Sequence, residues 1–320
     1  MADSGDRLLG VILAAGKGTR MYPFSDTLPK PVLPVCNRPL LALQLELMRQ
    51  HGIREVIIVV GHLGYAIVDA LGDGSREGVS IRYIQQDETL GMAHAVGKLE
   101  PYVHSPFLLL LGDIYLGTDD LTPLIRSVQS GESNAYLATK LEPDPEMVKR
   151  NFAVFEGAED RVIRVIEKPR YVRSSIKGCG LYIFDQTVFD AIRRTPRTAM
   201  RDEYEITDSI QIMINDGHLV RHRPVVHHDM NVTFPDDLLQ INLIELRKRK
   251  LDRLIAAGAQ LPDGMVVERS VIGEGASFAA PIRLSNSLAF PGARMEKASD
   301  QDHVILYGGT VIPCEHNPPG

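Results

Sequence analysis

The order of short apolar runs and helix-like segments leaves this chain few possible folds. The runs at residues 8–15, 55–61 and 107–113 are almost unbroken in apolar character, which is typical of strands buried on both faces. Residues 39–52 have helical spacing, with proline at the start and glycine at the end. Residues 91–100 are a second candidate helix. Strand, helix and strand in succession predict a mostly parallel sheet with helices on its faces.

A glycine-rich basic loop, GKGTR, starts at Gly16 directly after the first apolar run, and the third run ends in Asp113. In parallel sheets, ligands bind beyond the carboxyl ends of the strands. Because both features leave a buried strand at that end, we expect the loop and Asp113 to lie at one common edge of the sheet.

The middle of the chain continues the α/β pattern. Further strand-like runs occupy residues 134–141, 152–156, 161–169, 179–185 and 219–228. Residues 203–217 are helix-like, and residues 235–258 have the pattern of one long amphipathic helix. We place a domain boundary after this helix, which predicts a first domain at residues 1–258 and a second at residues 259–320.

The last segment has a different pattern. Val266, Ile272, Phe278, Leu284 and Phe290 are apolar at intervals of six, with small residues and proline between them. Hexad spacing is typical of a left-handed β-helix, in which every sixth residue points into a narrow prism; the alternative is an irregular loop. The pattern spans fewer than two coils, which is too short for an independent acyltransferase domain. We therefore expect an oligomerising or capping appendage, and a homo-oligomeric protein.

Composition excludes several classes of partner. The 320 residues carry a net charge of −6, whereas a nucleic-acid-binding protein usually needs a concentrated basic surface. The one dense basic run, at residues 247–250, lies in a helix-like segment and is expected to be a solvated face. The N-terminal apolar stretch is too short for a signal or a membrane span, and three separated cysteines indicate neither a disulfide framework nor a zinc site. We expect a cytoplasmic protein that binds neither nucleic acid nor membrane.

The glycine loop has the parts of a phosphate-binding site. It lacks the third glycine of the G-x-G-x-x-G motif and the spacing of a Walker A loop. Gly16 and Gly18 permit close backbone approach, so that consecutive N–H groups can form a nest for an anion. Thr19 adds a hydroxyl donor, Arg20 a planar guanidinium, and Lys30 an ammonium group framed by two prolines. A triphosphate chain would use all of these groups; the alternative is a turn with surface basic residues.

The stretch LAAGKGTRMYPFSDTLPKPVLPV resembles the signature of the sugar-1-phosphate nucleotidylyltransferases, which is L-A-[AG]-G-x-G-T-R-x-x-P…P-K-P. The resemblance covers residues 10–242. It implies an α/β, Rossmann-like three-layer nucleotidyltransferase fold with a mixed, mostly parallel sheet. It also implies that the loop binds the phosphates of a nucleoside triphosphate and that Lys30 stabilises charge on them. The implied nucleotide-binding residues are Leu13, Ala14, Ala15, Gly16, Gly18, Thr19 and Arg20.

The segment QQDETLGMAHAV resembles the base-reading segment of the same family. Gln86 lies five residues before Gly91, as in uridylyl and thymidylyl enzymes, and an amide can pair with the donor and acceptor edge of uracil or thymine. Asp113 resembles the family's magnesium-binding aspartate, and Mg2+ takes few protein ligands beside phosphate oxygens and water. Asn231 stands at the second ligand position, where many relatives have aspartate and the N-acetylglucosamine-1-phosphate uridylyltransferases have asparagine. Asp229 is a rival ligand.

The triplet EKP at residues 167–169 resembles the family's sugar site. Glu167 would accept hydrogen bonds from sugar hydroxyls, and Lys168 would hold the sugar phosphate. Gly180 occupies the usual glycine of the N-[AT]-G-[IL]-Y strand. Gly178 stands where many relatives have a sugar-contacting asparagine, and Ala153 stands where they often have glycine, so the identity of the sugar stays open.

Together these residues predict transfer of a nucleotidyl group from UTP or dTTP to a sugar 1-phosphate, with glucose 1-phosphate as the default acceptor. Two anions must meet in line, so positioning and charge neutralisation dominate. Lys168 would hold the attacking phosphate, Mg2+ on Asp113 and Asn231 would bridge the phosphates, and Arg20 with Lys30 would stabilise the departing pyrophosphate. Three alternatives stay open: an N-acetylhexosamine-1-phosphate uridylyltransferase, a nucleotide-sensing homologue without turnover, and a transferase of phosphocholine or another non-sugar phosphate.

Overall fold

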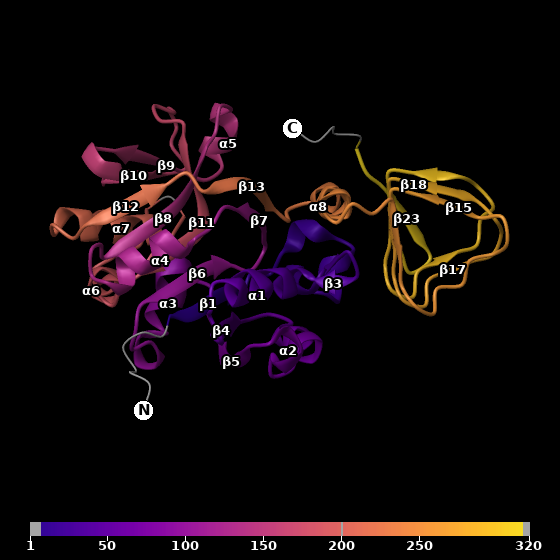
Figure 1. Cartoon of the computed structure of the whole chain (residues 1–320), viewed down its shortest axis with the longest axis horizontal. Coiled ribbons are helices and arrows are strands. Elements are labelled where there is room, and N and C mark those ends of the chain that lie inside the picture. The colour runs from indigo at the N-terminus through magenta and orange to yellow at the C-terminus, as the bar shows by residue number, and fades with distance from the viewer. Residues whose placement is uncertain (1–7, 200, 316–320) are drawn as a thin grey trace. The chain divides into compact units, whose positions relative to one another are not determined.

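The computed structural model of the chain describes residues 8–199 and 201–315 (Figure 1). The chain divides into two compact units, each built from separate stretches of sequence. The first unit comprises Met1–Lys17 and Gln44–Asp229, and the second comprises Gly18–Leu43 and Met230–Gly320. Each unit contains a hydrophobic core of its own. The borders of the two compact units therefore differ from the predicted domain boundary after Gly258. That boundary stays a prediction.

The first unit is built on a mixed nine-stranded sheet. Its strands are β1 Leu9–Ala14, β4 Glu55–Val60, β5 Ser80–Gln85, β6 Phe107–Leu111, β8 Ala135–Leu141, β9 Phe152–Glu156, β10 Val162–Glu167, β11 Ile176–Phe184 and β12 Val220–Arg223. They follow the order β10-β9-β11-β6-β1-β4-β5, with β8 paired to β11 and β12 to β8. The central strands β6, β1, β4 and β5 are parallel, whereas β11 runs antiparallel to its partners. The expected mixed, mostly parallel sheet is confirmed.

The three apolar runs of the sequence form the centre of this sheet. Val11 on β1 lies between Ile57 on β4 and Leu109 on β6, and all three side chains are buried in the core. Burial of each such aliphatic side chain stabilises the fold by about 1.5–3 kcal/mol relative to exposure. Because these strands are covered on both faces, their sequences are apolar throughout rather than alternating.

Helices surround the sheet of the first unit. The described helices are α1 Leu40–Gln50 (from Gln44 onward in this unit), α2 Gly64–Leu71, α3 Met92–Gly97, α4 Thr122–Gln129, α5 Pro145–Lys149, α6 Thr187–Arg193 and α7 Ile206–Asn215. The predicted helices correspond to α1, α3 and α7. The others have no more than eight residues each, which leaves little room for a helical repeat of apolar residues to show in the sequence.

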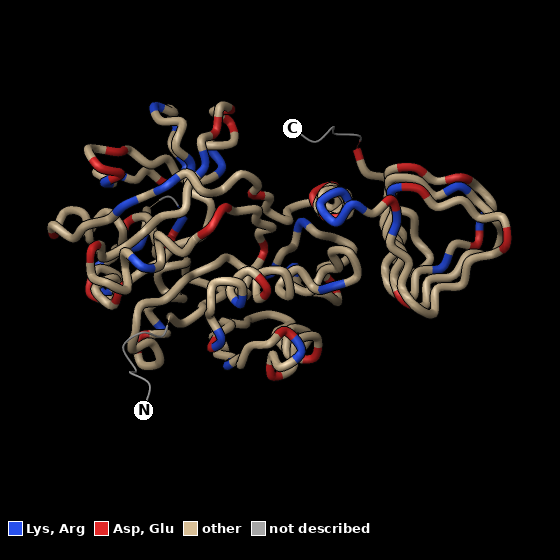
Figure 2. The backbone as a smooth tube through the Cα atoms, viewed as in Figure 1, with Lys and Arg blue, Asp and Glu red and all other residues tan. Residues whose placement is uncertain are grey.

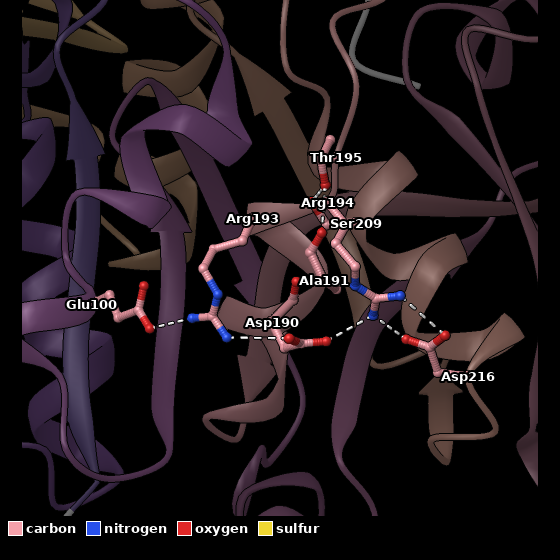
Figure 3. Close-up of polar contacts among 8 residues, drawn as sticks. All are labelled: Glu100, Asp190, Ala191, Arg193, Arg194, Thr195, Ser209 and Asp216. Atoms are coloured by element: carbon pink, nitrogen blue, oxygen red, sulfur yellow. Dashed lines mark hydrogen bonds and ion pairs between the residues drawn. The ribbon is translucent and has the colours of Figure 1, made fainter.

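Charged side chains connect α6 to the elements around it (Figure 3). Ion pairs join five side chains one after another, in the order Glu100, Arg193, Asp190, Arg194 and Asp216. Each arginine has two carboxylate partners. Because the side chains are largely exposed, the pairs orient the helix but contribute little to stability.

The second unit begins with the remainder of the glycine loop. Short 3-10 turns at Thr19–Met21, Phe24–Asp26 and Lys30–Val32 lead into the hairpin of β2 Pro34–Val35 and β3 Arg38–Pro39. Asn242, on helix α8 (Pro235–Lys248), fixes this stretch. Its side-chain amide donates to the carbonyls of Pro34 and Leu238, each at 2.9 Å, and its oxygen accepts from the Cys36 N–H at 2.7 Å. Asn242 is fully buried, and these three bonds satisfy both its N–H groups and its oxygen.

Helix α8 is shorter than the sequence pattern predicted. It ends at Lys248, and strand β14 follows at Arg253–Ile255. Lys250 has a φ of 57°, a left-handed conformation that cannot continue an α-helix. The predicted helix at residues 235–258 is therefore wrong beyond Lys248.

From β14 onward the chain forms stacked coils, drawn in orange to yellow in Figure 1. Their strands are β14, β15 Val266–Glu268, β16 Ser270–Ile272, β17 Ser277–Phe278, β18 Arg283–Ser285, β19 Leu288–Ala289, β20 Arg294–Met295, β21 Gln301–Asp302, β22 Val304–Tyr307 and β23 Thr310–Pro313. Parallel pairs join Leu254 to Val271, Val271 to Leu288 and Leu288 to Ile305, so each coil takes 17 residues. The expectation of fewer than two coils is wrong, because this register repeats three times. β23 then returns antiparallel to β22 and ends the stack.

The interior of the coils does not follow a strict interval of six. The core residues along one and a third coils include Val267, Ile272, Phe278, Leu284 and Ala289. One interval in each coil is five residues long, which gives the repeat of 17. Val266 is 42% exposed, and Phe290 stacks on Phe24 with 4.7 Å between ring centroids. The hexad assignment is therefore wrong for Val266 and Phe290, which lie one residue out of register.

Charges of both signs are interspersed along both units (Figure 2). Arg247, Lys248 and Lys250 are exposed at the end of α8, which confirms the expected solvated basic face and complements the helix dipole. In the part of the chain that the structure describes, no helix combines the length and apolar character that crossing a membrane requires.

Candidate active site

The ends of β1, β4 and β6 lie against one another at one edge of the first unit's sheet. The Gly112 N–H, directly after β6, donates to the Leu13 carbonyl at 2.8 Å. A Cβ atom at Gly61 would lie 2.7 Å from the Ala15 carbonyl oxygen, and one at Gly112 would lie 2.9 Å from that of Leu13. Only glycine allows these backbones to approach so closely. Asp113 therefore leaves β6 beside the start of the glycine loop, as expected for that part of the loop.

Helix α1 holds the turn that carries Asp113. The Gln44 side-chain amide donates to the carbonyls of Leu111 and Ile114, at 2.8 and 2.7 Å. Gln44 is 3% exposed, so its amide group fixes the backbone on both sides of Asp113 away from competing water. No sequence pattern indicates this role, because a single glutamine in a helix looks the same whether it is buried or on the surface.

The rest of the glycine loop lies in the second unit. Gly18 has a φ of 64°, a conformation that favours glycine, and its carbonyl accepts a bond from the Met21 N–H at 2.9 Å. A Cβ atom at Gly18 would lie 3.0 Å from Cγ of Lys30. The stem of Lys30 thus packs directly on the glycine turn, while Thr19 and Arg20 beside it are exposed. The structure brings Lys30 to the loop, as the phosphate-binding hypothesis requires.

Gln86 follows strand β5 and continues its pairing. Its backbone N–H donates to the Val60 carbonyl at 2.7 Å, and its side-chain amide donates to the Glu88 carbonyl at 2.8 Å. Gln86 is only 6% exposed. The contact with Glu88 uses one of the two amide N–H groups, so the other N–H and the oxygen can still serve the edge of a base.

The turn at Gly91 depends on a distant segment of the chain. Gly91 has a φ of 110°, and a Cβ atom there would lie 2.5 Å from the Tyr204 carbonyl oxygen. The Tyr204 N–H donates to Leu90 at 2.8 Å, and the Tyr204 carbonyl accepts from Ala93 at 2.9 Å. The backbone of Tyr204 therefore clamps the end of the predicted base-reading segment. No side-chain pattern in the sequence points to Tyr204, because the contact is made through backbone atoms.

Glu167, the last residue of β10, is the centre of a polar cluster. Arg201 donates to its carboxylate at 3.4 Å, and the Thr207 hydroxyl donates at 3.3 Å. The Lys168 ammonium lies 4.0 Å from the same carboxylate. Arg201 also donates to Glu205 at 2.6 Å. The structure thus adds Arg201 to the predicted pair of Glu167 and Lys168, and gives this site two cations.

The cluster holds Glu167 in an unfavourable environment for its charge. Burial raises the pKa of Glu167 above its ordinary value, and the charge of Glu205 raises that pKa further, whereas Lys168 and Arg201 lower it. Burial also raises the pKa of Glu205. Hydrogen-bond donors brought by a ligand would therefore stabilise the carboxylate of Glu167.

Phe152 fills the space above Gly178. A Cβ atom at Gly178 would lie 1.8 Å from Cζ of Phe152, and Phe152 is the cross-strand partner of Glu167. Directly opposed residues share one face of a sheet, so the ring lies on the side of Glu167. Ala153 is fully buried, and its methyl group points to the other face because side chains alternate along a strand. Gly180 has a φ of 69°, a conformation that favours glycine.

Asp229 is engaged by lysines. The fully buried Lys177 ammonium lies 2.8 Å from Asp229 and 3.3 Å from Glu142. Lys140 lies 3.2 Å from Glu142 and 3.8 Å from Asp229. This pairing makes Asp229 a poor metal ligand, because its charge is already neutralised. Asn231, the last residue of β13 (Val226–Asn231), is exposed and is the better candidate.

The residues present fit a metal site that is completed by a phosphate ligand, and they do not fit a metal site built from protein ligands alone. Among the described residues, no three or more histidine, cysteine, aspartate or glutamate side chains are grouped in a way that could hold a metal ion. Mg2+ needs only one or two carboxylates when phosphate oxygens and water complete its shell. Asp113 directly precedes β7 (Ile114–Thr118), which pairs with β13. The donor set therefore fits Mg2+ held together with a phosphate ligand, and does not fit a metal held by the protein alone.

The predicted site residues are divided between the two units. The first unit holds Leu13, Ala14, Ala15, Gly16, Gln86, Gly91, Asp113, Ala153, Glu167, Lys168, Gly178 and Gly180, and the second holds Gly18, Thr19, Arg20, Lys30 and Asn231. The chain passes from the first unit to the second within the glycine loop itself, between Lys17 and Gly18.

Comparison with known proteins gives one matching family and several named relatives. Residues 9–227 match the family model described as nucleotidyl transferase. A glucose-1-phosphate thymidylyltransferase of Streptomyces griseus is 32% identical over 94% of this chain and 88% of its own. The low-salt glycan biosynthesis nucleotidyltransferase Agl11 of Haloferax volcanii is 34% identical over 76% of this chain and 68% of its own. The UTP–glucose-1-phosphate uridylyltransferase AglF of the same organism is 28% identical over 71% and 92%.

Two solved structures have a fold similar to that of this chain. A putative glucose-1-phosphate thymidylyltransferase from Bacillus anthracis matches with a TM-score of 0.66 and 28% identity, over 74% of this chain and 94% of that one. A UDP-glucose pyrophosphorylase solved with UDP-glucose matches with a TM-score of 0.67 over 76% of this chain and all of that one. At 20% identity the second likeness shows the fold alone.

Proposed function

The chain belongs to the nucleotidyl transferase family, and we propose that it transfers a nucleotidyl group from UTP or dTTP to a sugar 1-phosphate. Glucose 1-phosphate is the proposed acceptor, and pyrophosphate is the second product. Relatives named as glucose-1-phosphate thymidylyltransferase and as UTP–glucose-1-phosphate uridylyltransferase support this choice.

The contact between Gly112 and Leu13 is the observation that carries the proposal. The bond of 2.8 Å between their backbones sets Asp113 beside the start of a loop with the family's phosphate-binding sequence. A carboxylate next to bound phosphates is what a nucleoside triphosphate with its magnesium ion requires.

The proposed reaction needs no protein base. An oxygen of the sugar phosphate attacks the α-phosphorus, and the bond from that phosphorus to the bridging oxygen breaks, so pyrophosphate leaves with the electron pair. The acceptor is already an anion, and the task of the protein is to position two anions in line and to neutralise charge. The family signature on this chain supplies the cations Arg20 and Lys30, as this task requires.

In the first unit, the Glu167 cluster is the proposed sugar phosphate site. Lys168 and Arg201 supply two positive charges beside Glu167, and a guanidinium suits phosphate oxygens. Lys168 is 48% exposed and is free to reach a ligand in solvent. Glu167 would accept hydrogen bonds from sugar hydroxyls, which would replace the water lost on burial.

In the second unit, Arg20 and Lys30 are the proposed partners of the triphosphate. The packing of Lys30 on Gly18 limits the positions of the ammonium group to the neighbourhood of the loop. Gly16, Gly18 and Thr19 would contribute backbone N–H and hydroxyl donors to the phosphates. Developing negative charge on pyrophosphate is then met by fixed donors rather than by water.

Asp113 and Asn231 are the proposed ligands of Mg2+, with phosphate oxygens and water in the other positions. The bound ion would neutralise charge on the phosphates. The Gln44 bonds to Leu111 and Ile114 hold the backbone on both sides of Asp113, so the carboxylate is positioned before a ligand arrives. Asn231 brings an amide oxygen without charge, which leaves Asp113 as the anionic ligand.

Gln86 is the proposed reader of a pyrimidine base. Its amide can present a donor and an acceptor together, as uracil and thymine require. Because the contact with Glu88 fixes the rotation of this amide, a purine with a different edge pattern should bind less well.

A crossed panel of nucleoside triphosphates and sugar 1-phosphates tests the proposal. The full chain is incubated with Mg2+ and each pair, and pyrophosphate release is measured. We expect the highest kcat/KM for UTP or dTTP with glucose 1-phosphate. N-acetylglucosamine 1-phosphate tests the main alternative acceptor. Absence of pyrophosphate release with every pair would refute the proposed activity.

A further inference from the structure

A pocket of about 620 Å3 lies in the first unit where β10 begins. It is lined by the turn that precedes β10, by the end of α7 and by the start of β12. Val162, Ile163 and Leu219 give the pocket an apolar part, and Arg161 and Arg221 give it a cationic part. This volume is within the range of sites that hold small organic ligands.

The two arginines are direct neighbours. Arg161 and Arg221 are partners in an antiparallel β-bridge, and both line the pocket. Like charges that face each other across paired strands repel. Arg161 is exposed, and Arg221 donates to the Glu159 carbonyl at 3.3 Å. In the described part of the chain neither guanidinium has an ion pair with a carboxylate, so the protein itself does not balance the two charges.

The Arg221 guanidinium has an unused donor. Its Nε atom is buried without a hydrogen-bond partner. Buried donors are paired in the great majority of native structures, and an unpaired one calls for a specific explanation such as a bound ion. Here the unpaired donor belongs to a residue that lines the pocket, and the same guanidinium carries further N–H groups that an acceptor bound in the pocket can use.

We propose that this pocket binds a small oxyanion carried on an apolar body, as in a phosphate monoester or a carboxylate. Guanidinium groups bind such oxygens through paired, charge-assisted hydrogen bonds. An anion beside Arg161 and Arg221 removes their repulsion, and the apolar body contacts Val162, Ile163 and Leu219. Glu159 also lines the pocket, and its negative charge weakens the binding of an anion.

The pocket is separate from the proposed active site. Val162 is the first residue of β10, and Glu167 is the last. At about 3.3 Å per residue along a strand, the two ends lie roughly 16 Å apart. Binding in this pocket therefore does not depend on the proposed nucleotidyl transfer.

Calorimetric titration of the full chain with n-butyl phosphate, inorganic phosphate and pentanoate tests the proposal. We expect n-butyl phosphate to bind more tightly than inorganic phosphate, because only the former has an apolar body. Arg161→Gln should raise the Kd for n-butyl phosphate about tenfold, the usual size of a lost charge-assisted hydrogen bond. Glu159→Gln should lower this Kd, because a repelling charge is removed.

Two control variants separate this pocket from other cationic sites. Arg223→Gln removes a nearby exposed guanidinium, which lies 3.9 Å from Asp160 and does not line the pocket. Lys30→Ala removes a cation of the proposed active site. Both should bind n-butyl phosphate as the unaltered chain does.

The measured Kd values of these variants support or overturn the proposed anion site. Binding of n-butyl phosphate alone, or of pentanoate as well, supports it and distinguishes phosphate monoesters from carboxylates. An unchanged Kd in both Arg161→Gln and Glu159→Gln overturns it, as does a loss of binding only in Lys30→Ala. Arg161 is exposed, so its replacement should leave the melting temperature unchanged, and a measured Tm confirms that the variant is folded.

Discussion

The Lys177 ammonium lies 2.8 Å from Asp229 Oδ2, and this buried ion pair joins β11 to β13. Burial acts to lower the pKa of Lys177, but the charge of Asp229, its hydrogen bond and the charges of Cys179 and Glu142 together raise that pKa above its ordinary value. Lys177 is therefore charged inside the fold. Since β13 also carries Asn231, the pair holds a strand that belongs to the proposed site.

Lys177→Met should lower the free energy of unfolding by about 3–5 kcal/mol, because it leaves the buried carboxylate of Asp229 without its main partner. Urea denaturation followed by far-UV circular dichroism measures the effect. Lys149→Ala is the matched control: Lys149 pairs with Glu146 on the surface, and its replacement should cost less than about 1 kcal/mol. Similar costs for the two variants would show that the buried pair does not stabilise the fold.

Gly91→Ala should raise the KM for the nucleoside triphosphate by about tenfold or more, because a Cβ atom at 2.5 Å from the Tyr204 carbonyl must displace the base-reading segment. Steady-state kinetics with saturating sugar 1-phosphate measures this KM. Gly131→Ala is the control, since Gly131 also has a positive φ, of 78°, but has no atom within 4 Å of the new Cβ. If the two variants have equal KM values, the contact with Tyr204 is not what positions the segment.

The strands were the most predictable part of the fold, and particular residues show why. Val11, Ile57 and Leu109 are buried between neighbouring strands and helices. Their burial requires apolar residues, so an unbroken apolar run in the sequence predicts a buried strand. The end of α8 was not predictable in this way. Residues 249–258 keep an apolar and polar mixture that suits a helix, but Arg253–Ile255 within them form β14, because this strand pairs with β16, 17 residues later. That pairing is a property of the whole coil and not of the local sequence.

The proposed site was predictable where one motif holds several of its residues. Gly18 and Lys30 are separated by a short stretch with a recognisable pattern, and in the structure the stem of Lys30 packs on Gly18. Gln44, Arg201 and Tyr204 were missed. Each acts on a site residue that is far away in the sequence, and two of them act on backbone atoms, so no local pattern identifies them.

Lys168→Ala and Asp113→Ala should each reduce kcat for pyrophosphate release by about a hundredfold or more, the usual effect of losing a charge that stabilises the transition state. Arg201→Gln should reduce kcat/KM for the sugar 1-phosphate by about tenfold, because Lys168 still provides one cation. The control is Lys98→Ala, which removes a lysine that has no assigned role in the site. Near-normal turnover of Lys168→Ala or Asp113→Ala would show that these roles are wrong.

Glu167 should give the activity a distinct dependence on pH. Burial, followed by the charge of Glu205, raises the pKa of Glu167 above its ordinary value of 4.5, and the proposed role requires its ionised form. We therefore expect kcat/KM to fall on acidification at a pH above 4.5. In Glu167→Gln this fall should disappear, with a lower rate at neutral pH.

The raised pKa of Glu167 also determines whether its ionised carboxylate stabilises or destabilises the fold. Because the pKa of Glu167 is raised in the fold, its contribution to stability is full below the pKa of the unfolded chain and is lost as the pH rises through the folded pKa. Glu167→Gln should therefore increase the Tm relative to the unaltered chain at pH 7, and this gain should vanish at pH 4. An increase in Tm at pH 4 that is absent at pH 7 would contradict this. It would mean that the charges of Arg201 and Lys168 outweigh burial and lower the pKa of Glu167.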